Sequence, residues 1–401
     1  MMEQNSKHFF KLAAEKYNVP NPVEGVKGGK QYVTWGEDNL WPQTAINLTE
    51  ISTIHNACIQ KKLEFALGQK ITYTANNSFL SQVNEWGENI VDIYNKTVYD
   101  YIVYKEYAIN VVWSRDGQSI ASMEHVDMSR VRKGKKDLYG NITTYYVCAD
   151  WSDTKRNKIN EIPAFSKEDA TDMPSQLYVF STYNPTQQYY AKPDYLAALA
   201  YIYLDFEIAN FHISNIKNGF FPSLLLNLRS QTDSQEERDD IWSELSKQYK
   251  GSRNAGEVMV SFSPEGVDAE QIQANTNSDL FITLNNMVQQ YILTAHRITS
   301  PMLLGIKSEG QLGGRTEIVD ATELFLNGVI IPIQNQVIGG ITRLLRVSDM
   351  SVEFNIEQVQ PVANTMSDSL MEKVLTQDEI REMYGYEPLI TTQTEGDQSN
   401  G

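Results

Sequence analysis

The stretch that decides the fold begins with SDLFITLNNMVQQYILTAHRITSPMLLG at residues 278–305 and ends with TEIVDATELFLNGVIIPIQNQVIGGITRLL at residues 316–345. Its first part predicts a helix, because Asn277 and Ser278 are good N-caps and apolar residues follow at helical spacing. These apolar residues are Leu280, Leu284, Met287, Val288, Tyr291 and Ala295. Pro301 ends the helix, since proline has no backbone N–H and disfavours helical geometry in the residue before it.

A glycine-rich loop separates this helix from a longer one. Glycines stand at positions 305, 310, 313 and 314, and glycine accepts backbone angles that other residues avoid. The second helix is expected to begin near Thr316 and to present Ile318, Ala321 and Phe325 on one face. We expect Pro332 to kink it.

Composition places the chain among globular proteins. Its 401 residues suffice for two or three domains, and 41% hydrophobic with 21% charged residues argues against disorder. The net charge of −17 argues against a freely diffusing nucleic-acid binder but does not exclude a protein that surrounds DNA without adhering to it. Cys58 and Cys148 form no disulfide framework. We expect an intracellular protein with no signal peptide and no membrane span, because Met1–Lys16 is polar and the most apolar run, Tyr195–Leu204, is short.

The N-terminal half combines helices with strands. Residues 1–30 are interpreted as an arm, and the following segment with Trp35 and Trp41 as an anchor on the chain's own core. Helices are expected over residues 51–67 and 79–107, with Trp86 on the apolar face of the second region. Strands are expected at 71–74, 108–113, 120–125, 145–148 and 177–180, with a hairpin turn at Asp116-Gly117. We interpret one basic cluster as a solvated loop, with a phosphate contact as the alternative: Arg130, Arg132, Lys133, Lys135 and Lys136.

The next region predicts a long helix with a small insert after it. Pro193 opens a helix that should run to Asn218 and reach about 40 Å. Residues 220–275 show a β-α-β pattern, in which Ser234 to Glu237 form a capping box before the helix. A second capping box at 376–379 begins a short helix, and residues 391–401 are expected to be disordered.

No motif of an enzyme was found. Gly305 and Gly310 have the spacing of a phosphate-binding loop, but the Lys and Ser/Thr that must follow the second glycine are missing. The motifs G-x-S-x-G, H-E-x-x-H and C-x-x-C do not occur, and the histidines at 8, 55, 125, 212 and 296 are scattered. We therefore expect no catalytic residues, no metal and no cofactor.

Taken in order, several weak motifs resemble the portal proteins of tailed double-stranded DNA bacteriophages. They are YYAKPDYLAAL at 189–199, NIKNGFFPS at 215–223, KGSRNAG at 250–256, ITSPMLLG at 298–305 and DEIREMYG at 378–385. The order of these motifs over more than half the chain is the argument for the resemblance.

The resemblance implies an α+β, multidomain portal-type subunit that assembles into a ring, expected to be a dodecamer. Its parts would be an N-terminal arm (1–30), an α/β wing with the long kinked helix (31–192 and 316–346), two stem helices (193–219 and 276–300), a clip (220–275), a tunnel loop (301–315), and a short crown-like segment with a disordered tail (347–401). The tunnel loop would turn Lys307, Glu309, Gln311 and Arg315 toward DNA. The clip would meet the large terminase subunit through Glu236, Glu237, Asp239 and Asp240.

The resemblance also implies a role and partners. The ring would stand at one capsid vertex of the virion, with synthesis in the bacterial cytoplasm, and double-stranded DNA would pass through it during packaging and ejection without sequence recognition. A head-tail adaptor, the major capsid protein and the scaffolding protein would be further partners, and no membrane would be involved. Two alternatives stay open: a helical interaction scaffold without a DNA role, and a soluble enzyme whose site has no recognisable motif.

Overall fold

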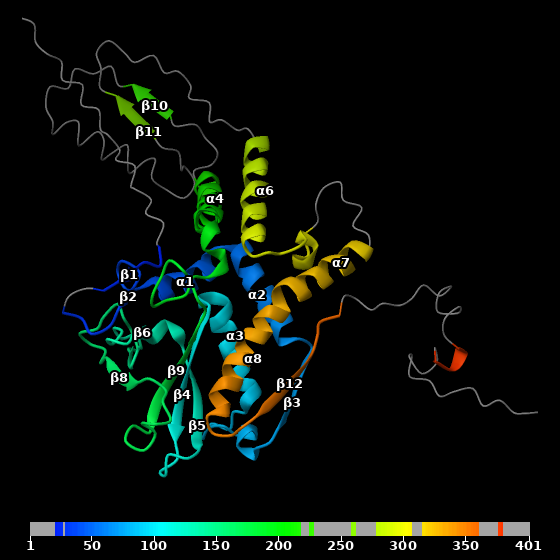
Figure 1. The fold of residues 1–401 in the computed structure, drawn as a ribbon. Helices are drawn as coiled ribbons and strands as arrows, with labels where there is room; N and C mark the ends of the chain where they lie inside the picture. Colours follow the sequence, from blue (N-terminus) through cyan, green and yellow to red (C-terminus); the bar gives the residue numbers. More distant parts are fainter. Residues whose placement is uncertain are drawn as a thin grey trace, which may run out of the picture. The chain divides into compact units, whose positions relative to one another are not determined.

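The computed structural model describes residues 21–26, 29–217, 224–227, 258–261, 278–306, 315–360 and 376–379. The chain divides into two compact units, residues 1–358 and 359–401, which are considered separately. Nearly all of the described elements lie in the first unit (Figure 1).

The larger sheets among the described residues of this unit are two antiparallel three-stranded ones. The first has the order β5-β4-β9, with β4 at Glu106–Trp113, β5 at Ile120–Val126 and β9 at Ser175–Ser181. The second has the order β6-β7-β8, with β6 at Val131–Lys133, β7 at Thr144–Val147 and β8 at Asn160–Pro163. A parallel bridge from Ala164 to Leu177 joins the end of β8 to β9. The strands and the hairpin turn expected at Asp116-Gly117 are confirmed.

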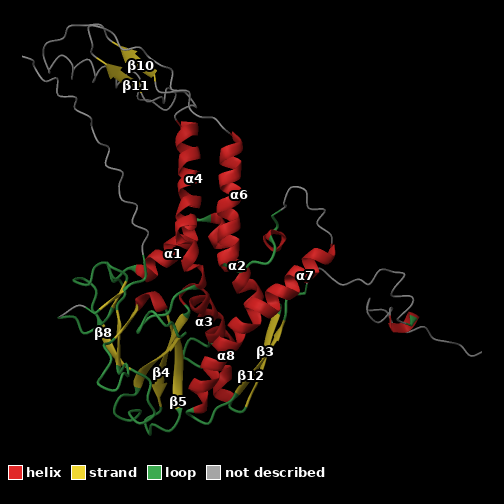
Figure 2. Ribbon diagram, turned by 45° about the horizontal axis from the view of Figure 1, so that its top comes forward, coloured by secondary structure: helices red, strands yellow, loops and turns green. Residues whose placement is uncertain are grey.

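Helices α3 (Ile90–Tyr104) and α8 (Ile331–Arg346) pack against the first sheet, and further helices lie beside them (Figure 2). The helices that precede α3 are α1 (Trp41–Ile51) and α2 (Thr53–Leu67), with 3-10 turns η1 at Ser78–Ser81 and η2 at Met128–Arg130. A capping box begins α3, in which Asn89 accepts from the N–H of Asp92 and the Asp92 carboxylate accepts from the N–H of Asn89. The strand β3 (Lys70–Ala75) pairs with β12 (Val352–Glu357), far along the chain.

The expected anchoring of the N-terminal tryptophans is confirmed. Trp35, in β2 (Thr34–Trp35), and Trp41 are buried, and Trp35 stacks on Tyr190 with ring centroids 4.3 Å apart. The strand β1 (Glu24–Gly25) pairs with β2. Stacked and buried aromatic rings remove a large apolar area from water, which fixes this segment to the core.

The deciding stretch folds as expected, with one refinement. The first helix is α6 (Ser278–Ala295), the Pro301 break is a 3-10 turn, η4 (Pro301–Leu304), and the second helix is α7 (Arg315–Phe325) followed by α8 (Ile331–Arg346). Between α7 and α8 lies a π-helical segment, η5 (Leu326–Ile330). The kink expected at Pro332 is thus a π-helical segment just before it. Proline has no backbone N–H, so the α-helical hydrogen bond from residue 332 to the preceding turn cannot form.

The span Glu317–Arg346 is long and apolar enough to cross a membrane by length and composition. Half of its most apolar window is buried inside the protein, and α8 packs on α3. This burial is typical of the core helix of a globular unit.

The two helices that precede and follow the expected insert lie side by side. The first is a 3-10 turn, η3 (Asp194–Ala198), continued by α4 (Leu199–Lys217), so the α-helix begins later than the expected Pro193. It packs along α6, where the rings of Tyr201 and Tyr291 stack at 4.4 Å. Figure 1 shows this helix pair, α4 and α6, projecting from the sheets and helices of the unit.

Within the insert, the structure describes only its two strands. β10 (Leu224–Asn227) and β11 (Val258–Ser261) pair in parallel, as a β-α-β pattern requires. In the second unit, Thr376 and Glu379 form the expected capping box.

Two interpretations of the N-terminal half are corrected. Arg132 and Lys133 belong to no solvated loop: both are buried in β6, where the Arg132 guanidinium donates to Asn39 and Lys133 pairs with Glu106. Both positive charges stabilise the fold, because their side chains lie inside the protein and meet Asn39 and Glu106, which are distant in sequence. Trp86 lies in the loop between η1 and α3, and 71% of its surface is exposed.

Gly340 lets α8 approach the first sheet closely. A Cβ built there would lie 1.9 Å from the Tyr107 hydroxyl and 2.8 Å from the Phe180 ring. We expect Gly340→Ala to destabilise the fold by about 1–3 kcal/mol, because the packed core must shift to admit the methyl group. Urea unfolding measures this loss, and Gly339→Ala is the matched control, since nothing lies within 4 Å of a Cβ at Gly339. Equal unfolding midpoints for the two variants would contradict this account.

Candidate functional site

The root of the helix pair is held by charged side chains. Asp194, at the start of η3, lies 2.7 Å from the Lys105 ammonium and 3.9 Å from the Arg297 guanidinium. Lys105 ends α3 and Arg297 follows α6, and both adopt the left-handed conformation that L side chains rarely take. One carboxylate thus joins the beginning of the first helix, the end of the second and the end of α3.

A histidine pair lies beside this carboxylate. The His55 Nδ1 and His296 Nε2 atoms are 2.8 Å apart, and both rings are fully buried. Tyr195 stacks on His296 with ring centroids 5.5 Å apart, and its hydroxyl donates to the Val103 carbonyl. The pair therefore connects α2 with the end of α6.

A further contact fixes α4 to α2. The Ser52 hydroxyl donates to the Asp205 carboxylate at 2.8 Å and accepts from the backbone N–H of His55 at 3.2 Å. Ser52 is thus the N-cap of α2 and an anchor of α4 at once. We call the set Ser52, His55, Lys62, Lys105, Asp194, Asp205, His296 and Arg297 the root cluster.

Burial and neighbouring charges shift the pKa values of His55, Lys62, Asp194 and His296. Burial, together with the nearby Lys62 charge, lowers the pKa of His55 to about 3 and that of His296 well below its ordinary value. Burial also lowers the pKa of Lys62 to about 8, although Asp194 opposes the shift. Burial raises the pKa of Asp194, but the charges of Lys105 and Lys62 outweigh it and the pKa is lowered. Both histidines are therefore neutral at neutral pH.

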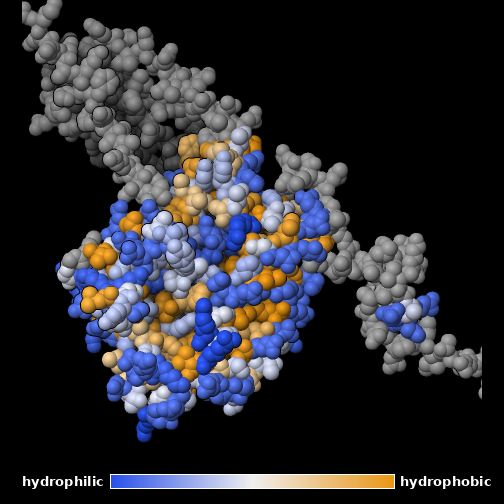
Figure 3. All heavy atoms as spheres, in the orientation of Figure 1, coloured by the Kyte–Doolittle hydropathy of each residue, from blue (hydrophilic) through white to orange (hydrophobic). Residues whose placement is uncertain are grey.

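Beyond the root, the helix pair exposes large apolar side chains. Among the described residues of α4 and α6 these are Phe211 (44% exposed), Ile213 (48%), Ile282 (58%), Met287 (41%) and Tyr291 (46%). Apolar surface is visible on the pair in Figure 3. Apolar side chains gathered on a projecting element are typical of a surface that another protein covers.

Most site residues expected from the sequence fall outside the described residues. These are Lys307, Glu309 and Gln311 of the tunnel loop and Glu236, Glu237, Asp239 and Asp240 of the clip. Arg315 is the first residue of α7. The root cluster, in contrast, was missed: its histidines are 241 residues apart in the sequence, and no local spacing relates them.

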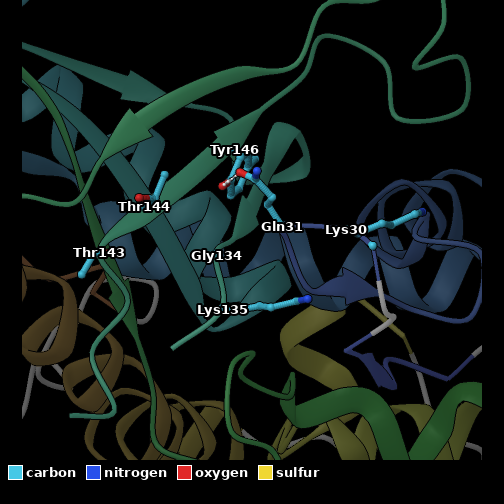
Figure 4. A pocket seen from close by; sticks show the side chains of 8 residues that line it. Lys30, Gln31, Gly134, Lys135, Thr143, Thr144 and Tyr146 are labelled. Atoms are coloured by element: carbon cyan, nitrogen blue, oxygen red, sulfur yellow. Dashed lines mark hydrogen bonds between the residues drawn. The ribbon is translucent and has the colours of Figure 1, made fainter. Parts of the chain in front are cut away.

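Two surface pockets flank the β6–β7 hairpin. One, of about 420 Å³, is lined by residues that include Lys30, Gln31, Lys135 and Tyr146, and the Tyr146 hydroxyl donates to Gln31 (Figure 4). The other, of about 480 Å³, lies against β9. Neither has the arrangement of a catalytic centre, and within the described ranges no three His, Cys, Asp or Glu side chains could hold a metal ion.

Known proteins resemble the chain in sequence and in fold. The chain is 26% identical over 155 residues to a probable portal protein of Haemophilus phage HP1, which covers 38% of this chain and 44% of that protein. Among solved structures, a chain from the neck of a native GTA particle computed with C12 symmetry matches with a TM-score of 0.53 and 14% identity, covering 87% of this chain and 95% of the other. A chain from the neck of an empty GTA particle computed with C6 symmetry gives 0.52 and 13%, covering 87% and 94%.

The family model of the phage portal proteins matches residues 62–385. This range includes the helix pair, the Pro301 break and the long helix α7–η5–α8. It therefore contains the stretch that decided the fold, and the chain belongs to the phage portal protein family.

Proposed function

We propose that this chain is a subunit of a ring-shaped portal, which stands at one vertex of a phage capsid and passes double-stranded DNA during packaging and ejection. The observation that carries the proposal is the projecting helix pair with its five exposed apolar side chains. We interpret the pair as the stem, and the sheets with α1–α3 and α8 as the wing.

A ring accounts for the exposed apolar side chains. Identical subunits joined head to tail by two different surfaces close into a ring when the rotation between neighbours allows it. Each stem would then be covered by the stems on either side. The C12 symmetry in the description of one related neck structure supports a dodecamer as the expected number.

The charge of the chain fits a DNA conduit. With 51 acidic and 34 basic residues, the subunit would repel the DNA phosphates and let the duplex slide. The loop of residues 301–315 would line the channel, with Lys307 and Arg315 touching phosphates and Glu309 limiting how tightly the loop holds DNA. Gln311 is the fourth side chain that could turn toward the duplex.

The remaining partners follow from the same function. The segment 220–275 would be the clip, and Glu236, Glu237, Asp239 and Asp240 would form its acidic contact with the large terminase subunit. A head-tail adaptor would bind the assembled ring, and the capsid and scaffolding proteins would surround the wing. In this role the protein has no catalytic step of its own.

Imaging of the purified protein tests the function. Negative-stain electron microscopy and mass photometry should show closed rings with a central channel. Particles that remain monomeric across salt and protein concentrations, with scaffolding protein present as well as absent, would contradict the proposal. Small open oligomers instead of closed rings would favour the alternative, a helical scaffold without a DNA role.

The exposed apolar residues of the stem should control assembly. We expect Phe211→Ser/Ile213→Ser/Ile282→Ser to raise the subunit concentration needed for half-assembly at least about tenfold, because each lost apolar contact weakens the interface by about 1 kcal/mol or more. Mass photometry across a dilution series measures the shift. Met173→Ser is the control, since Met173 is 48% exposed in a loop of the wing. Unchanged assembly of the triple variant would show that the stems do not touch.

A further inference from the structure

We propose that the loop carrying Glu85 and Trp86 on one subunit docks onto the tip of the β6–β7 hairpin of the next subunit, which exposes Leu138 and Tyr139, and onto the 480 Å³ pocket lined in part by Tyr183. The proposal rests on the ring proposed above and adds a second contact between neighbours, in the wing. It assigns a role to Trp86, Tyr139 and Tyr183, whose side chains are mostly exposed in the single subunit.

The hairpin tip is rigid, although its two central side chains lie in solvent. The Asp137 carboxylate accepts from the N–H groups of Tyr139 and Asn141, each at 2.8 Å, and Gly140 closes the turn with a positive φ of 86°. Leu138 and Tyr139 on this turn are 101% and 88% exposed. A fixed turn that holds a leucine and a tyrosine in water is preorganised for binding, since little further ordering is needed on association.

The pocket beside the tip has aromatic walls and a positive charge. Tyr145, Tyr183, Tyr189 and Tyr190 line it, and its exposed positive charge is that of Lys136, because the buried Lys133 ammonium is already paired with Glu106. Tyr183, on the neighbouring loop, is 86% exposed. The pocket on the other side of the hairpin adds Lys30 and Lys135, and neither pocket has an aspartate or glutamate among its described lining residues. In a chain with a net charge of −17, this region favours an acidic partner.

The Glu85-Trp86 loop has the complementary chemistry. Trp86 is 71% exposed, and Glu85 beside it is also exposed. Asn84 holds the loop: its side chain accepts from the N–H groups of Trp86 at 3.1 Å and Glu88 at 3.2 Å, and donates to the Met123 carbonyl. An indole can enter an aromatic pocket while its neighbouring carboxylate meets lysine ammonium groups, and tryptophan and tyrosine are the residues that most often dominate interfaces.

The positions of the two surfaces favour a second copy of the chain as the occupant. The Trp86 loop lies at the free edge of β5, where the Val83 carbonyl accepts from the N–H of Met123. The pocket lies on the side of β9 and β6–β7, so β4 and β5 separate it from Trp86 within one subunit. Two complementary surfaces on different sides of a subunit make a head-to-tail contact, which is the kind that closes rings.

Cysteine cross-linking of the full chain tests the contact in the assembled ring. Gln82→Cys/Asn141→Cys places one thiol beside each surface and keeps Glu85, Trp86 and the lysines. Cys58 and Cys148 are buried and give little background. With a short bismaleimide, we expect a ladder of covalent multimers on denaturing gels from the double variant. Gln82→Cys alone, Asn141→Cys alone and the matched pair Gln118→Cys/Asn141→Cys should stay monomeric.

Charge reversal gives an independent test. We expect Glu85→Lys to raise the half-assembly concentration about tenfold, and Lys135→Glu/Lys136→Glu to do the same, whereas the triple reversal should restore most of the loss. Thermal unfolding should be unchanged by Trp86→Ser, since the indole is exposed, although assembly should weaken.

The outcomes separate this contact from the ring itself. Rings that form without a ladder, or with an equal ladder from the Gln118 control, overturn the contact and leave the ring standing. Failure of the triple reversal to restore assembly also overturns it. Binding of a double-stranded DNA oligonucleotide that is lost in Lys135→Glu/Lys136→Glu, with no ladder, would assign the lysines to nucleic acid. Absence of rings in the unmodified protein overturns the proposed function and this contact together.

Discussion

Replacing Glu106 by glutamine is expected to destabilise the protein by about 3–5 kcal/mol, because it leaves the Lys133 ammonium buried without a counter-charge. The carboxylate lies 2.9 Å from that ammonium, and both side chains are almost completely buried. Glu106 also accepts hydrogen bonds from the Ser181 hydroxyl and from the backbone N–H of Ala191. The Lys133 ammonium donates to the Tyr189 carbonyl at 2.7 Å, so the pair joins β4 and β6 to the segment that leads into η3 and α4.

Urea unfolding of three variants tests the role of this charge pair. Glu106→Gln should lose the most stability, whereas Glu106→Gln/Lys133→Met, which removes both charges, should recover part of it. Lys136→Met is the control, because Lys136 is an exposed lysine of the same hairpin. If the double variant is no more stable than Glu106→Gln, the loss comes from packing and not from the unpaired charge.

Much of the fold could be predicted from the sequence because its signals are local. Helix α6 follows from an apolar stripe between N-caps and Pro301, and α7–η5–α8 follows from a second stripe. The strands β4, β5 and β9 follow from short runs rich in β-branched and aromatic residues and from one turn at Asp116-Gly117. The pairing of β3 with β12 could not be predicted, since nothing in either strand identifies a partner about 280 residues away.

The root cluster escaped prediction for a physical reason. His55, Asp194 and His296 come from three separate segments, and only the packing of α2, η3 and α6 brings them together. The buried Arg132 and Lys133 show the converse case. A basic run usually lies in solvent, and burial here depends on acceptors distant in sequence, among them Asn39 for Arg132 and Glu106 for Lys133.

The histidine pair of the root cluster should make the fold sensitive to acid. Burial lowers the pKa of His55 to about 3, against an ordinary value of 6.5, and lowers that of His296 as well. At a pH between these two values, the histidines are protonated in the unfolded chain but stay neutral in the folded chain. The stability is therefore complete above about pH 6.5 and falls as the pH drops below it, by about 1.4 kcal/mol per pH unit for each histidine.

We expect the free energy of unfolding to fall by about 2–4 kcal/mol for the pair between pH 7.5 and pH 5. The Asp194 carboxylate stays ionised in this range, because its pKa is lowered, so the fall reports on the histidines. In His55→Gln/His296→Gln the fall should be much smaller than in the unmodified protein. The pH dependence of the unfolding free energy is compared between the unmodified protein and the double variant. This comparison cancels the contribution of Asp100, whose pKa is raised by burial in both proteins. Parallel stability curves for the double variant and the unmodified protein would mean that the two buried rings do not control the acid response of the fold.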